Sequence, residues 1–286
     1  MIQLDIHGKH PLAHREKASN DVNVDLNSLF APEPVLWHTQ ATGFALFGKG
    51  HLASLAASLV LVTCLVRAYL RLPRTDGLAP SEPRRRMLRA ISGAAVGLVA
   101  AKCACYLALG LFEPLFWPLH VCNLCEFVAL AYALVPRSPL GRRMADLLFC
   151  WGLTGCLGAL LLPGWHGYCP ALSLASICGF LEHALVFACA LCPLVGGDYA
   201  PQLRRMWFVL LVTVAGGAIF RLVNPLLGTN FFFVTNPAAV GGPFAWLVAT
   251  FGDPGFLVPH LGIAVASWAF AYGIYQVVVR TSGRHA

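Results

Sequence analysis

The chain has 286 residues, of which 58% are hydrophobic and only 12% are charged, and its mean hydropathy is +0.68. A soluble domain of this length carries about twice that charged fraction, so the composition excludes an ordinary globular protein. The net charge of +7 alone would suit a nucleic-acid-binding protein, but the charges are distributed as in a membrane protein, and we predict no nucleic-acid partner.

Seven apolar segments follow one another along the chain, each long enough to cross ~30 Å of hydrocarbon as a helix. They cover residues 45–70, 89–111, 115–135, 145–162, 171–195, 205–227 and 256–279. We therefore predict an all-α fold, a polytopic membrane bundle of seven transmembrane helices. Residues 44–280 form its single domain, residues 1–43 a polar, disordered N-terminal tail, and residues 281–286 a short C-terminal tail.

Basic residues occur in every second loop, as the positive-inside rule requires. Arginines gather in four places: Arg71, Arg74, Arg84, Arg85, Arg86 and Arg89; Arg137, Arg142 and Arg143; Arg204 and Arg205; and Arg280 and Arg284. The intervening loops, residues 112–114, 163–170 and 228–255, contain no lysine or arginine. This alternation predicts a cytoplasmic C-terminus and an N-terminus outside, with membrane lipids as the partners of the protein.

The longest of the predicted exterior loops is itself apolar. Residues 228–255 contain three consecutive phenylalanines and the segment PFAWLVATF, which is too short to span a membrane. The loop is expected either to form a lid over a buried site or to rest on the outer leaflet.

Ionisable side chains inside the predicted spans are costly, of order 2.5–3.5 kcal/mol each, so each needs either a partner, such as a hydrogen bond that bridges two helices, or a function. They are His51, Lys102, His120, Glu126, Glu182, His183, Arg221 and His260. With the predicted topology, six of the seven spans place such a group in the outer half of the bilayer. We therefore expect a hydrated polar chamber open to the exterior.

The third span carries several of these polar residues on one face. His120 and Asn123 are three positions apart, and Glu126 extends the same stripe. Cys122 is two positions from His120, about 200° around a helix, and should face elsewhere. Cys122 and Cys125 form a CxxC motif without a second such pair, so we predict neither a metal site nor a cofactor.

Several segments in order resemble the YwaF-type family of integral membrane proteins, which includes transmembrane protein 164. They are FGKGHLASLAA at His51, WPLHVC at His120, CWGLTGCLGALLLP at 150–163, the span leading to His183, and LLGTNFFFV at 226–234. The resemblance implies a membrane O-acyltransferase acting on glycerophospholipids, as its animal members look to be. Those members place a proposed nucleophilic cysteine directly before the third-span histidine, where this chain has Leu119. Leucine cannot form a thioester, so the covalent mechanism is not carried over.

Three functions remain open. The first is a lipid-modifying enzyme, an acyltransferase or hydrolase with a phospholipid or acyl substrate. His120 is its general base, His183, Glu182 and Asn123 complete the catalytic group, and substrate is bound by His51, Lys102, Arg221, Asn230 and His260. The second is a transporter or channel for a small polar or anionic solute, and the third an intramembrane zinc hydrolase using histidines.

Overall fold

The computed structural model describes residues 30–39, 43–235 and 243–281, and all regular structure in these residues is helical. Seven helices are long and apolar enough to span a membrane, which confirms the predicted all-α fold. In chain order the elements are α2 (Glu33–Thr39), α3 (Lys49–Arg71), α4 (Glu82–Ala108), η1 (Pro114–Phe116), α5 (Val121–Leu134), α6 (Pro139–Leu147), η2 (Leu148–Leu153), α7 (Thr154–Leu161), η3 (Gly164–Gly167), α8 (Leu174–Gly196), η4 (Leu203–Arg205), α9 (Met206–Leu227), η5 (Phe231–Phe233), α10 (Pro243–Phe251) and α11 (Leu257–Thr281).

Local sequence signals set several helix ends. The hydroxyls of Ser138 and Ser173 accept hydrogen bonds from the backbone N–H groups of Gly141 (2.9 Å) and Ser176 (3.2 Å), and so cap α6 and α8. Helix α8 ends at Gly197, whose φ of 71° is the left-handed conformation that glycine adopts without strain. The fourth span is continuous from α6 to α7 through η2, a short π-helical stretch.

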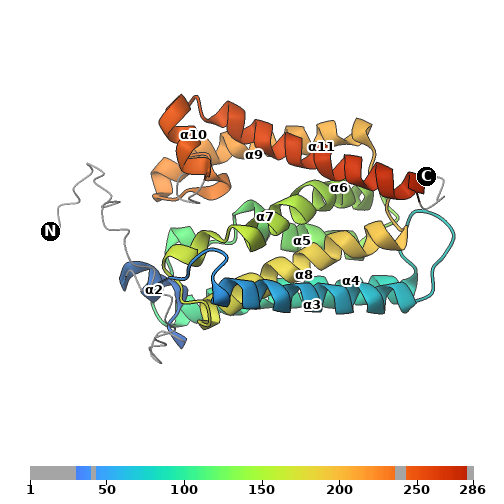
Figure 1. Cartoon of the computed structure of the whole chain (residues 1–286), viewed down its shortest axis with the longest axis horizontal. Helices are drawn as coiled ribbons and strands as arrows, with labels where there is room; N and C mark the ends of the chain where they lie inside the picture. The colour runs from blue at the N-terminus through green and yellow to red at the C-terminus, as the bar shows by residue number, and fades with distance from the viewer. Residues whose placement is uncertain (1–29, 40–42, 236–242, 282–286) are drawn as a thin grey trace.

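Helix α8 is the centre of the bundle and contacts α3, α4, α5, η2 and α7. Small residues such as Ala184 and Ala188 are fully buried along it and allow neighbouring helices to approach closely. Helices α9 and α11 lie on one side and are much less buried than α8. Figure 1 shows them as a separate layer above the other helices, with α10 at one end. Polar side chains that contact α8 therefore lie in the most buried part of the bundle.

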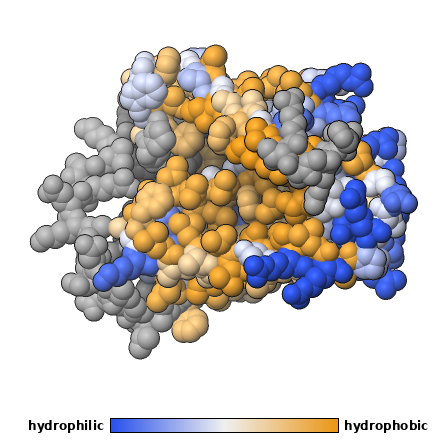
Figure 2. All heavy atoms as spheres, turned by 45° about the vertical axis from the view of Figure 1, so that its right-hand side comes forward, coloured by the Kyte–Doolittle hydropathy of each residue, from blue (hydrophilic) through white to orange (hydrophobic). Residues whose placement is uncertain are grey.

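The two ends of the bundle differ in polarity. The loops 72–81, 135–138 and 197–202 lie at one end, which we term the arginine-rich end, and helix α2 lies at the other, the α2 end. Figure 2 shows hydrophilic side chains gathered at one end of a largely apolar surface. Exposed side chains such as Leu222 and Val258, both at least three-quarters exposed, fit this surface to surrounding lipid. The multi-pass membrane location is thus established, while the predicted orientation stays a prediction.

Buried ion pairs hold the arginine-rich end together. Arg84 donates to Asp198 (2.8 Å), which also accepts a hydrogen bond from the Tyr69 hydroxyl (2.7 Å), and all three side chains are buried. Nearby, Asp146 accepts from Arg205 (3.0 Å) and from Tyr199 (2.8 Å). Burial and the Asp146 carboxylate raise the pKa of Tyr199 well above its usual value, which keeps the hydroxyl protonated as a donor. These contacts tie the connections α3–α4 and α8–α9 to the bundle.

Part of the N-terminal segment differs from the disordered tail expected for residues 1–43. Residues 33–39 form helix α2, which packs on the end of the bundle through the buried Leu36. Trp37 meets Tyr168 edge to face, with ring centroids 4.8 Å apart. These apolar contacts, together with a hydrogen bond between His38 and Glu113 (2.5 Å), hold this short helix against the bundle. Residues 1–29 lie outside the described part of the chain.

Candidate functional site

A buried ion pair joins α4 to α8 near the α2 end of the bundle. Lys102 Nζ lies 3.1 Å from Oε1 and 3.2 Å from Oε2 of Glu182. The Glu182 side chain is 3% exposed and that of Lys102 21%. Lys102 is six residues from the end of α4, which corresponds to a depth of about 9 Å. At that depth an unpaired charge would be strongly disfavoured, so each group stabilises the charge of the other.

A second carboxyl group lies beside this pair. Glu126 on α5 is 1% exposed and is within electrostatic range of both Glu182 and Lys102. Its Oε1 accepts a hydrogen bond from Asn123 Nδ2 at 3.4 Å, as expected for two residues on the same helix face, whereas Oε2 is buried without a partner. Lys102 balances one carboxylate, so the second carboxyl has no cation of its own here.

His120 approaches the same cluster from the start of α5. The helix begins at Val121, and His120 is its N-cap with extended backbone (φ −66°, ψ 152°). The expected helical stripe therefore starts at Asn123, and the angle drawn from His120 to Cys122 does not apply. Cys122 is instead one turn before Glu126, within electrostatic range of that carboxyl group. The imidazole is within electrostatic range of Lys102, and its Nδ1 is buried with no hydrogen-bond partner.

Residues 229–235 fold back from the end of α9 and cover His120. The His120 ring lies 5.1 Å from the rings of both Phe231 and Phe233. Asn224, buried in α9, accepts from the Phe231 N–H (2.9 Å) and donates to its carbonyl (3.0 Å). Phe232, at a left-handed φ of 59°, inserts between Phe220 and Trp151. The described part of the predicted loop 228–255 therefore includes a segment packed against the bundle, and residues 236–242 lie outside the description.

His183 follows Glu182 on α8 and has one ring nitrogen fixed. Its Nδ1 lies 2.7 Å from the carbonyl oxygen of Gly179 and must carry the proton, because a carbonyl can only accept. The ring packs on Trp165 with centroids 5.3 Å apart. A side chain at Gly179 would meet Trp165 at 2.9 Å, which explains why this position is glycine. Nε2 is then left with its lone pair, the arrangement of a general base.

Three residues of this region were not singled out by the sequence. Glu33, at the start of α2, accepts hydrogen bonds from the hydroxyls of Tyr168 (2.9 Å) and Tyr106 (3.5 Å). It is also within electrostatic range of Lys102. Burial, together with the Glu33 carboxylate, raises the pKa of Tyr168 well above its usual value, so that hydroxyl remains a donor. The signal that could have revealed Glu33 is the short apolar run PVLW that follows it.

His51 does not take part in this cluster. It is fully buried, its Nδ1 accepts from the Phe47 N–H (2.9 Å), and its Nε2 donates to the Leu160 carbonyl (2.9 Å). Both nitrogens are therefore used to join α3 to the end of α7. These contacts give His51 a structural role, and we do not carry its predicted role in substrate binding into the proposed site.

The remaining predicted site residues lie in the layer of α9 and α11. Arg221 pairs with Asp253 (2.5 and 2.6 Å) and donates to the Val234 carbonyl (2.9 Å), which ties α9 to the segment before α11. Asn230 accepts from the Thr235 N–H (3.2 Å). The His260 ring packs against Phe244, with centroids 5.8 Å apart. The expected single chamber is therefore divided into a cluster around Lys102 and a separate set of contacts on α9 and α11.

The positions of the possible metal ligands can be compared with the zinc hydrolase hypothesis. Within residues 30–39, 43–235 and 243–281, no three histidine, cysteine, aspartate or glutamate side chains lie close enough together to bind one metal ion. Zinc sites need three or four such ligands. The zinc hydrolase expected as a third possibility has no support in this geometry.

Fold and cluster together define a class of protein: a multi-pass helical membrane protein that holds carboxyl, ammonium and imidazole groups inside its bundle. The sequence model of the TMEM164 family matches residues 46–272, most of the chain. The chain belongs to the TMEM164 family, which confirms the resemblance seen in its sequence. No curated protein and no solved structure matches this sequence.

Proposed function

We propose that this protein is a lipid-modifying enzyme, an acyltransferase or hydrolase acting on glycerophospholipid, and that its reaction takes place beside Lys102. The observation that carries the proposal is a group of buried acid–base side chains around Lys102, some of whose polar atoms have no hydrogen-bond partner. His120 Nδ1 and Glu126 Oε2 are buried without partners next to the Lys102–Glu182 pair. Ionisable groups at such a depth in a membrane domain usually serve a function.

The proposed chemistry assigns a role to each group. His120 accepts the proton of the attacking hydroxyl, from water or a lysolipid, as its oxygen bonds to the ester carbonyl carbon. The imidazolium then returns that proton to the alkoxide that leaves. Lys102 and the Asn123 amide stabilise the developing oxyanion, and Glu182 holds Lys102 in place. His183, with Nδ1 fixed by Gly179, is a second base close to the same ion pair.

A lipid substrate must pass the segment 229–235 to reach His120. Because the rings of Phe231 and Phe233 contact His120, a lipid ester must displace this segment or enter beside it. The environment of His120 is therefore apolar on the loop side and polar on the Lys102 side, which suits an amphipathic ester. Asn230 belongs to this segment, so its proposed role in substrate binding depends on the position of the segment.

The test is lipid turnover by the purified protein. The full chain in nanodiscs is incubated with a phospholipid and a lysophospholipid, and products are measured by mass spectrometry. His120→Gln should lower turnover by about 10²–10⁴-fold, the usual contribution of a general base. His38→Gln is the matched control, because that imidazole is 60% exposed and lies outside the cluster. Equal turnover in wild type and His120→Gln would remove His120 from the chemistry.

A transporter for a small polar or anionic solute is the second candidate. It is favoured by the buried Glu126 carboxyl group, which has no cation of its own, since such carboxyl groups occur in the proton relays of transporters. It is also consistent with the light packing of α9 and α11 against the other helices. Uptake of labelled solute into liposomes, with no change in lipid composition, would replace the enzymatic proposal with this one.

A further inference from the structure

One partly buried arginine at the arginine-rich end, Arg143, forms no ion pair with any described carboxylate, although Asp146 lies within electrostatic range of it. The guanidinium carbon of Arg143 on α6 lies 4.8 Å from the ring centre of Phe208 and 5.7 Å from that of Trp207, both at the start of α9. Its Nη1 is buried and has no hydrogen-bond partner. Asp146, one turn further along α6, already binds Arg205 and Tyr199.

The surroundings of Arg143 are strongly basic. Arg137, Arg142 and Arg204 are exposed at the same end, and none of the described carboxylates forms an ion pair with them or with Arg143. A stacked guanidinium keeps its N–H groups in one plane, which matches the two oxygens of a phosphate. Arg143, which follows Arg142 in sequence and stacks on Trp207 three residues after Arg204, is thus placed to bind an anion that bears a phosphate.

The position of these arginines favours a lipid headgroup over a soluble anion as the source of that phosphate. Arg143 and Trp207 lie about one turn inside their spans, which begin at Pro139 and Leu203. Trp207 is 56% exposed, as an aromatic side chain at the boundary between lipid and water commonly is. A headgroup phosphate of the surrounding leaflet lies at this level, whereas a soluble anion would have to enter the membrane boundary.

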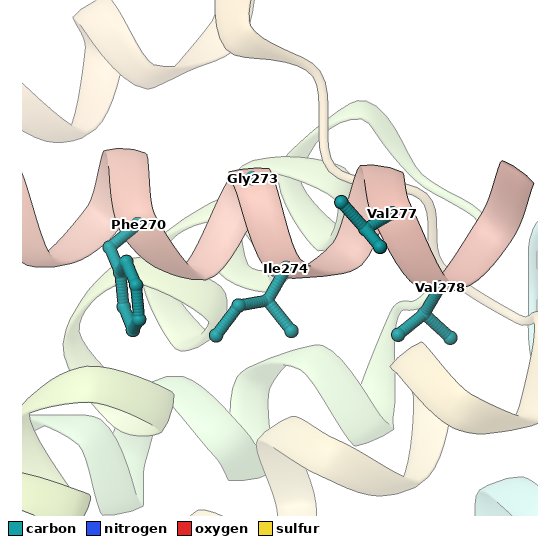
Figure 3. A pocket seen from close by; sticks show the side chains of 5 residues that line it. All are labelled: Phe270, Gly273, Ile274, Val277 and Val278. Carbon is teal, nitrogen blue, oxygen red and sulfur yellow. The ribbon is translucent and has the colours of Figure 1, made fainter. Parts of the chain in front are cut away.

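An open apolar hollow on the surface of α11, which we term the groove, lies toward the same end of the bundle and is a candidate seat for an acyl chain. It has a volume of about 360 Å³ and runs along the second half of α11, lined by Phe270, Gly273, Ile274, Val277 and Val278. Figure 3 shows Phe270, Ile274 and Val278 pointing from α11 toward the helices drawn below it. A side chain built at Gly273 would meet no atom within 4 Å, so the groove is open there.

From this combination we infer that the protein binds an anionic glycerophospholipid at its arginine-rich end, with the phosphate on Arg142, Arg143 and Arg204 and an acyl chain in the groove on α11. The site lies at the opposite end of the spans from Lys102 and His120 and does not depend on the proposed reaction. Each arginine near an anionic surface contributes about 1 kcal/mol to such binding, and the stacked Arg143 should contribute more.

Native mass spectrometry of the full chain can test the inference. The protein is released from nanodiscs of equal parts phosphatidylglycerol and phosphatidylcholine, and retained lipids are counted. Wild type should retain phosphatidylglycerol selectively, and Arg143→Gln should weaken that selectivity about tenfold, as expected for the loss of a charged hydrogen bond. Arg86→Gln is the matched control, because Arg86 is an exposed arginine at the same end that pairs with Glu82.

Each other outcome of this experiment is decisive. Equal selectivity in Arg143→Gln and wild type overturns the site, and equal loss in Arg86→Gln reduces it to a general effect of positive charge. Displacement of the lipid by soluble glycerol phosphate at comparable concentration would show that the site takes a free phosphate.

Gly273→Phe should fill the groove and lower retention, and unchanged retention would remove the groove from the site. Arg143→Lys, which keeps the charge but not the planar fork, decides the matter if Arg143→Gln fails to fold.

Discussion

Removal of the ammonium group from the buried pair is the most direct test of the cluster. In Lys102→Met, Glu182 loses the only cation within ion-pair distance of it among the described residues. The carboxyl group can stay buried if it takes up a proton. For an ordinary glutamic acid, with a pKa of about 4.3, protonation at pH 7 costs about 3.7 kcal/mol, because each unit is worth 1.36 kcal/mol. This figure falls within the range of about 3–5 kcal/mol found when one partner of a buried pair is removed.

The same reasoning fixes how the loss depends on pH. The cost of protonating Glu182 falls by about 1.4 kcal/mol for each unit of pH lowered, so the variant should recover to within about 1 kcal/mol of wild type near pH 5. Equilibrium unfolding in mixed micelles, followed by circular dichroism at several pH values, measures this difference. The double variant Lys102→Met/Glu182→Gln should regain most of the loss at pH 7. Lys49→Met is the matched control, since Lys49 is exposed at the start of α3. A loss in Lys102→Met that is absent, or that is constant between pH 5 and pH 8, would refute the pairing argument.

Two further predictions concern His51, whose ring nitrogens are both hydrogen-bonded, and Glu126, which is buried without a cation of its own. His51→Leu should lower the free energy of unfolding by about 2–4 kcal/mol, because it leaves the Leu160 carbonyl and the Phe47 N–H without their partner; a stability equal to wild type would mean that His51 is not the link between α3 and α7. Glu126→Gln should change stability by less than about 1 kcal/mol, since an amide replaces a carboxyl group that has no cation of its own. Unfolding of both variants in the same micelles measures the two effects, and a large loss in Glu126→Gln would show that Glu126 is charged and paired.

The spans could be predicted from sequence because a membrane leaves the backbone few alternatives. Every N–H and C=O group in hydrocarbon must be satisfied within the segment, so an apolar stretch of sufficient length becomes a helix. The first span, expected at 45–70, is helix α3 at Lys49–Arg71. The fourth was expected at 145–162 and is longer, because the polar and arginine-containing start of α6 continues the same helix. Hydropathy detects the apolar middle of a span and not its amphipathic ends.

The candidate site could be predicted only in part. The helical spacing of Asn123 and Glu126 placed them on one face, and their hydrogen bond follows from it. His120 was expected within that helix, but its backbone is extended, so the helix starts only at Val121. Both ring nitrogens of His51 are occupied, whereas His120 has a free nitrogen. This difference depends on partners far away in sequence, such as the Leu160 carbonyl bonded to His51. No local pattern contains that information.

The charge balance of the cluster explains why its groups belong together. Lys102 compensates Glu182, and a second ionised carboxylate beside them would add a net negative charge inside the bundle, where little water is available to solvate it. Glu126 therefore fits the site best as a neutral acid, which can donate a proton from Oε2, the oxygen that has no partner. His120, desolvated by Phe231 and Phe233 and close to Lys102, fits best as a neutral base. A neutral acid and a neutral base near one ion pair can exchange a proton through a bound substrate without any change in the total charge buried in the membrane.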